Sequence, residues 1–275
     1  MHRPHPELAR SVLRSIETYR RAVGPHALRL QATPEGEWED FDERGWGDIR
    51  RKMLEEPWAY VGLTCGPDSE EKYLVDYKGR PLDPSSILYT PEQVCSLSFW
   101  FPTEFLEQHG PQKMRELFME LATPLPLCSG NAGLSFLCNL DEAGVSKHVR
   151  KYCFRYPGMG LSLPTLLALD SNRTVGSPSW LTFLGQPVLG ELGGVSGLRS
   201  RLHTPGTTVQ ELEGDRAVVT LGPWPEAGDT EQGKDLPAYR ELARVLEPWT
   251  LWGEGEYVLN MNPDDARRWE RRFLD

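Results

Sequence analysis

Three stretches of the chain repeat apolar residues at helical spacing. Residues 6–23, 111–122 and 236–246 place them three and four positions apart, as expected for a helix with one buried face. A proline stands near the start of each stretch, where the missing amide hydrogen is tolerated. We therefore predict three amphipathic helices, together with shorter helices that end at His109 and span Pro263–Phe273.

Other stretches alternate apolar and polar residues, which is typical of strands with one buried face. The clearest is Val94–Phe101, which Pro102 ends because proline cannot donate a ladder hydrogen bond. Further strands are predicted at Ala59–Thr64, Tyr73–Tyr77, Ala132–Cys138 and Trp180–Leu184, with a hairpin of Val209–Leu212 and Ala217–Leu221. The helices between Val94 and Cys138 are long enough for a crossover, so parallel pairing of the strands on either side of them remains an alternative.

The order of these elements indicates the fold class. The chain has 275 residues, enough to bury a substantial core as one large domain or two intimate lobes. It contains no internal repeat, low-complexity linker or break in composition. We predict a single α+β domain over residues 1–275, with a mixed β-sheet flanked by helices. The order of the strands cannot be read from the sequence.

Residues 32–48 form the most acidic segment of the chain. Seven acidic residues stand there against the single Arg44, interleaved with Trp38, Phe41 and Trp46. We predict a surface loop, followed by a short helix over Asp48–Glu55. The whole chain carries a net charge of −10, which disfavours direct binding of nucleic acid. This charge suits a basic protein partner, although solubility alone also explains it.

Cysteine content and hydropathy bear on the compartment. The five cysteines are an odd number without CxxC spacing, which favours free thiols in a reducing cytosol. No apolar run has the length of a membrane span, and the N-terminal residues lack the apolar core of a signal peptide. We expect a cytoplasmic protein without membrane contact.

Known catalytic and ligand-binding patterns are missing from the sequence. The six histidines are scattered, and neither HExxH nor CxxC occurs, so no metal is expected. Gly194–Gly197 departs from the spacing of a nucleophile elbow, and no dinucleotide or Walker motif is complete. Pro67-Asp68 with Glu70-Glu71-Lys72 resembles the PD…(D/E)xK nuclease motif, but both parts lie within one six-residue turn, so this match is rejected. We predict no catalytic residue, metal or cofactor.

Five short motifs rich in glycine, proline and aromatic residues punctuate the chain. They are SFWFP at Ser98–Pro102, CSGNAG at Cys128–Gly133, RYPG at Arg155–Gly158, WLTFLG at Trp180–Gly185 and GPWPEAGD at Gly222–Asp229. Each alone is explained by turns and core aromatic residues. Together, over residues 89–248, their order and spacing resemble the bacterial type VI immunity proteins paired with VRR-NUC and related restriction-endonuclease-fold toxins.

This resemblance implies a binding protein that sterically blocks a cognate nuclease effector in bacterial competition. A nuclease that grips phosphates needs a basic cleft, which the acidic segment can cover. The predicted partner-binding residues are Glu37, Trp38, Glu39, Asp40, Phe41, Asp42 and Glu43. An ordinary solvated loop explains the same residues. The alternative function is an uncharacterised hydrolase that uses carboxylates such as Glu226 and Asp229.

Overall fold

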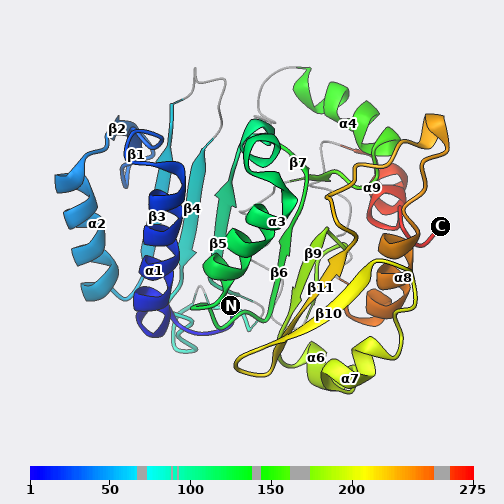
Figure 1. Cartoon of the computed structure of the whole chain (residues 1–275). Coiled ribbons are helices and arrows are strands. Elements are labelled where there is room, and N and C mark those ends of the chain that lie inside the picture. Colours follow the sequence, from blue (N-terminus) through cyan, green and yellow to red (C-terminus); the bar gives the residue numbers. More distant parts are fainter. Residues whose placement is uncertain (67–72, 88, 92, 138–143, 162–173, 251–260) are drawn as a thin grey trace. The chain divides into compact units, whose positions relative to one another are not determined.

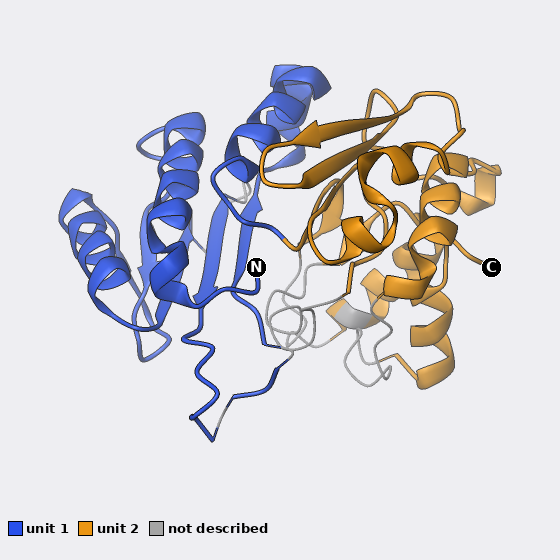
Figure 2. Cartoon of the chain, turned by 90° about the horizontal axis from the view of Figure 1, so that it is seen from below, with its two compact units in different colours: residues 1–127, 164–172 blue, residues 128–163, 173–275 orange. Residues whose placement is uncertain are grey.

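The computed structural model describes residues 1–66, 73–87, 89–91, 93–137, 144–161, 174–250 and 261–275 (Figure 1). The chain divides into two compact units (Figure 2). Unit 1 comprises Met1–Leu127 and Pro164–Asn172, and unit 2 comprises Cys128–Leu163 and Arg173–Asp275. That the two units form a single domain over residues 1–275 stays a prediction.

Unit 1 contains a five-stranded sheet of order β2-β1-β3-β4-β5 in which every neighbouring pair is antiparallel. Its strands are β1 (Leu30–Ala32), β2 (Trp38–Asp40), β3 (Ala59–Thr64), β4 (Leu74–Gly79) and β5 (Ser96–Trp100). Its helices are α1 (His5–Val23), α2 (Glu43–Glu55) and α3 (Thr103–Ala122). Gly110, with φ 76°, interrupts α3 at the predicted helix boundary.

The core of unit 1 lies between these helices and one face of the sheet. Val61 and Leu63 of β3 alternate with residues on the other face and pack with the apolar stripe of α1. Val75 and Tyr77 of β4 do the same. Figure 1 shows α1 and α3 lying over the sheet. The stripe predicted for the first helix therefore faces the sheet core.

Unit 2 contains a four-stranded antiparallel sheet of order β10-β11-β9-β6 and a two-stranded parallel sheet of β7 and β8. The strands are β6 (Ser129–Ala132), β7 (Ser135–Phe136), β8 (Gly160–Leu161), β9 (Leu181–Leu184), β10 (Thr207–Leu212) and β11 (Arg216–Leu221). The helices are α4 (Val145–Arg155), α6 (Val188–Glu191), α7 (Gly194–Arg199), η1 (Thr230–Gln232), α8 (Pro237–Leu246), η2 (Glu247–Trp249) and α9 (Pro263–Glu270). Leu242 and Leu246 of α8 are fully buried in the core against β9 and β11.

The α+β class and the β10–β11 hairpin are confirmed. A parallel pair of the predicted strands Val94–Phe101 and Ala132–Cys138 is wrong, because β5 and β7 belong to different sheets and the parallel partner of β7 is β8. The acidic segment is not a plain loop: it contains β2, and α2 begins at Glu43 rather than near Asp48.

Two expectations about compartment can be compared with the structure. Cys65, Cys95, Cys128 and Cys153 are free thiols, whereas Cys138 lies outside the described residues. Within the described ranges, no helix is long and apolar enough to cross a membrane.

Candidate functional site

The predicted partner-binding residues lie in the β1–β2 hairpin and at the start of α2. Strand β2 ends the sheet and pairs with β1 in the register Ala32 opposite Trp38. Glu37, Trp38 and Asp40 are exposed, and Trp38 keeps 46% of its surface accessible. These three side chains are therefore available to a partner.

The remaining members of the predicted set hold the hairpin in place. The Asp42 carboxylate caps α2 by accepting a hydrogen bond from the Gly45 amide at 2.8 Å. Glu39 accepts a 2.7 Å hydrogen bond from the side-chain amide of Gln31. Phe41 is half-buried and packs against the core of unit 1.

Arg20 of α1 connects the first helix to this hairpin. Its guanidinium lies 5.2 Å from the ring centroid of Phe41 and 4.5 Å from that of Trp46. The same group donates to Glu43 at 2.7 Å. Only 19% of the Arg20 side chain is exposed. Arg20 thus fixes the start of α2 beside the acidic strand.

A second cluster gathers four of the five sequence motifs in unit 2. Strand β6, from the CSGNAG motif, pairs with β9 of WLTFLG. The Trp180 indole donates to the Gly222 carbonyl at 3.0 Å, joining WLTFLG to GPWPEAGD. The Gly158 amide donates to the Ala227 carbonyl at 2.8 Å, joining RYPG to the same motif. SFWFP contributes instead to β5 and the start of α3 in unit 1.

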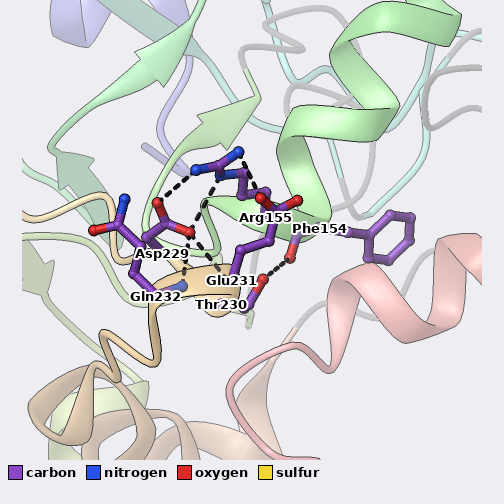
Figure 3. Close-up of polar contacts among 6 residues, drawn as sticks. All are labelled: Phe154, Arg155, Asp229, Thr230, Glu231 and Gln232. Carbon is purple, nitrogen blue, oxygen red and sulfur yellow. Dashed lines mark hydrogen bonds and ion pairs between the residues drawn. The ribbon is translucent and has the colours of Figure 1, made fainter.

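An ion pair between Arg155 and Asp229 closes this cluster (Figure 3). The Arg155 guanidinium donates from Nε to Oδ1 at 3.2 Å and from Nη2 to Oδ2 at 3.0 Å. Its Nη1 lies 2.7 Å from Oε2 of Glu231. Because the two planar groups match, this arrangement fixes the end of α4 against η1.

The Asp229 carboxylate also caps η1. It accepts hydrogen bonds from the amides of Glu231 at 3.0 Å and Gln232 at 3.3 Å. Only 5% of Asp229 is exposed. The hydrogen bond from Arg155 is the main reason why the pKa of Asp229 lies below its usual range. The carboxylate therefore stays ionised and its oxygens are occupied by internal donors.

This geometry weakens the hydrolase alternative. A general base or nucleophile must reach a substrate, whereas Asp229 is turned toward Arg155 and its own helix. Glu226 is exposed, and its backbone amide points to the Tyr239 hydroxyl at 3.5 Å. Among the described side chains, no three His, Cys, Asp or Glu residues gather where they could hold a metal ion. Chemistry based on this carboxylate pair thus lacks a built site.

The depressed pKa of Asp229 predicts a defined dependence of stability on pH. Because the folded-state pKa is below the unfolded value, the stabilisation is complete above about pH 4 and is lost as the pH falls through the folded-state value. Asp229→Asn should therefore lower Tm at pH 7. The difference from the wild type should narrow as both proteins are measured at successively lower pH. A constant difference down to pH values where carboxylates are protonated would contradict this assignment.

The family of the chain follows from a match along nearly its whole length. The model of the TsiV family, described as type VI immunity for VRR-NUC, matches residues 11–273. The chain belongs to this family. The resemblance carried by the five motifs is confirmed, and the match also extends over the acidic hairpin and over residues 11–23 of the first helix.

Comparison with solved structures supports the fold of this TsiV family member. The Pseudomonas aeruginosa T6SS protein PA0821 is similar, with a TM-score of 0.73 and 22% sequence identity. The similarity covers 96% of this chain and 78% of that chain. At this identity the likeness shows a shared fold. Among curated proteins, none matches the chain.

Proposed function

We propose that this protein binds a VRR-NUC nuclease effector in a one-to-one complex and sterically prevents it from reaching DNA. The observation that carries the proposal is the family match over residues 11–273. Immunity against a nuclease requires no chemistry by the inhibitor, since covering the cleft that takes DNA is sufficient. The internal engagement of Asp229 is consistent with such a role.

Charge supports fast formation of this complex. The chain carries a net charge of −10, and a protein that grips DNA phosphates presents a basic surface. Opposite charges accelerate association, which matters when few copies of a nuclease can kill a cell. Slow dissociation requires in addition a well-packed interface, on the order of 1,600 Å² in total, with a few aromatic or arginine anchors. Exposed Glu37 and Asp40 contribute negative charge to association, and exposed Trp38 contributes an aromatic anchor.

The proposed compartment is the cytoplasm, where the DNA of a bacterium lies. Cys65, Cys95 and Cys153 are buried free thiols, which suit a reducing environment. The proposed partner is a protein, with no direct contact between this chain and nucleic acid.

Titration of the purified protein against a VRR-NUC nuclease tests the proposal. The probe is the purified cognate VRR-NUC effector, and the measurement is cleavage of plasmid DNA. Inhibition should be complete near an equimolar ratio, with both proteins unmodified in their intact masses. Complete inhibition at a small fraction of that ratio would indicate an enzymatic antidote. Absence of binding would also refute the proposal.

A further inference from the structure

The sheet of unit 1 has a face opposite its helices, which we call the outer face. Strand register defines it: Trp38 lies opposite Ala32, and Gly62 lies opposite Asp76. Tyr60 is two residues from Gly62 and shares this face. Helices α1, α2 and α3 pack on the other face, against residues such as Val61 and Tyr77. On the outer face lie Ala32, Trp38, Asp40, Tyr60, Gly62 and Asp76, together with Lys78, which lies opposite Tyr60.

Large aromatic side chains are exposed on and beside this face. Trp38 is 46% exposed and Tyr60 is 43% exposed. Trp58, which precedes β3 by one residue, is 53% exposed. Single exposed aromatic residues are ordinary, but several around three adjoining strands form the kind of patch that marks an interaction surface.

The Tyr60 ring is held along the sheet rather than free in solvent. A Cβ atom at Gly62 would lie 2.9 Å from the Tyr60 hydroxyl oxygen and 3.0 Å from the Ala32 Cβ. Gly62 and Ala32 therefore leave the shallow space that the ring occupies. The hydroxyl donates a long hydrogen bond of 3.4 Å to Oδ2 of Asp76. A side chain ordered in this way loses less conformational entropy when a partner binds.

Asp76 holds this ring through one of its two carboxylate oxygens. Its Oδ1 atom is shielded from solvent and has no hydrogen-bond partner. Desolvation is the main reason why the pKa of Asp76 lies above its ordinary value. Because Oδ1 is closed to solvent, a docking partner does not reach this atom, and the role of Asp76 is to hold the Tyr60 hydroxyl through Oδ2.

The charge around the free edge of the sheet indicates the kind of partner. Beyond β1, the sheet ends at β2, and exposed carboxylates surround it. They belong to Glu35, Glu37, Glu39, Asp40, Asp42 and Glu43. A basic surface complements this edge, whereas DNA or an acidic protein would be repelled.

We infer that the outer face and its β2 edge form the docking surface for the basic, DNA-contacting side of the nuclease effector. Trp38 and Tyr60 are the aromatic anchors, and the exposed Asp40 receives a cationic side chain. This inference rests on the proposed function and adds the surface through which the effector is blocked.

Paired aromatic substitutions test the surface. The chain offers a matched control, because Trp224 and Tyr152 of unit 2 are also 46% and 43% exposed. Binding of the full-length nuclease effector is measured by calorimetry for each double variant. Trp38→Ala with Tyr60→Ala should raise Kd at least about 100-fold, as loss of two anchors does. Trp224→Ala with Tyr152→Ala should leave Kd within about 3-fold of the wild type, as loss of contacts outside the anchors does.

Charge reversal provides a test that does not disturb the aromatic patch. Asp40→Lys on the edge strand β2 should slow association about 10-fold at low salt and weaken its salt dependence. Glu211→Lys is the control, since Glu211 is exposed on β10, the edge strand of the unit 2 sheet. The control should leave the association rate near that of the wild type.

The outcomes separate this inference from the proposed function. If the wild type does not inhibit the nuclease, the proposed function fails. If the wild type inhibits at an equimolar ratio and the Trp38/Tyr60 variant is folded and binds equally well, the outer face is not the docking surface. If that variant does not fold, an association rate of Asp40→Lys equal to that of the wild type refutes the docking surface. A change in oligomeric state without a change in Kd would assign the face to self-association and also overturn the inference.

Discussion

Trp180→Ala should lower the free energy of unfolding by about 3–5 kcal/mol, the usual cost of emptying a large aromatic site in a core. Trp180 is 2% exposed and directly precedes β9. Its indole donates to the Gly222 carbonyl at 3.0 Å, and its own carbonyl accepts from the Leu221 amide at 2.8 Å. The substitution removes both the packing and one of these connections. Urea unfolding followed by circular dichroism measures the change.

Two further variants interpret this result. Trp180→Phe keeps most of the packing but leaves the Gly222 carbonyl without its donor, at an expected cost of about 1–3 kcal/mol. Trp224→Ala is the control, because a residue with 46% exposure should change stability by no more than about 0.5 kcal/mol. If Trp180→Ala lowers the free energy of unfolding no more than Trp224→Ala does, Trp180 is not a core residue. The hydrogen bond between the WLTFLG and GPWPEAGD motifs would then not stabilise the fold.

Local sequence was sufficient to predict many individual elements of this fold. The apolar stripe at Leu8–Tyr19 forms the buried side of α1, because helical spacing places these residues on one face. Gly110 breaks α3 where the sequence predicts a restart, since φ 76° is accessible mainly to glycine. The β10–β11 turn likewise places Gly214 and Asp215 at φ 74° and 54°. In each case the deciding interaction lies within a few residues.

Pairing between distant segments could not be predicted in the same way. The chain leaves the sheet of unit 1 at β5 and enters that of unit 2 at β6, with only α3 between them. The apolar–polar alternation of a strand does not indicate which sheet the strand joins. Strand β2 has three exposed residues and no alternation at all. Strand β2 forms because its backbone pairs with β1, and this pairing has no signal in the local sequence. The sequence of the acidic segment is therefore typical of a loop.

The candidate sites show the same limit. Arg155 begins one family motif and Asp229 ends another, which was the available signal, but 74 positions separate them in the chain. Their pairing makes Asp229 a structural carboxylate, a role that composition does not reveal. The acidic neighbours of Trp38 mark it in the sequence, whereas Tyr60 carries no such mark, because only strand register places both residues on the outer face.

Gly158→Ala should destabilise the protein by about 1–3 kcal/mol, the usual cost of overpacking a tight contact. A Cβ atom at this position would lie 2.0 Å from the Glu226 carbonyl oxygen and 3.0 Å from Ala227. Backbone atoms cannot turn away as a flexible side chain does, so the RYPG and GPWPEAGD segments must separate. This movement would stretch the 2.8 Å hydrogen bond from the Gly158 amide to Ala227. Urea unfolding measures the loss.

Gly47→Ala is the matched control for this substitution. Gly47 lies inside α2, and no atom lies within 4 Å of the position that its Cβ would take. Because alanine favours helix over glycine, this variant should gain about 0.5–1 kcal/mol. The two changes add the same methyl group, so opposite signs would assign the loss at Gly158 to the close approach of Glu226. Equal stability of Gly158→Ala and the wild type would show that the two segments are not held at this distance. In that case the Arg155–Asp229 pair, rather than backbone contact, would be what joins the two motifs.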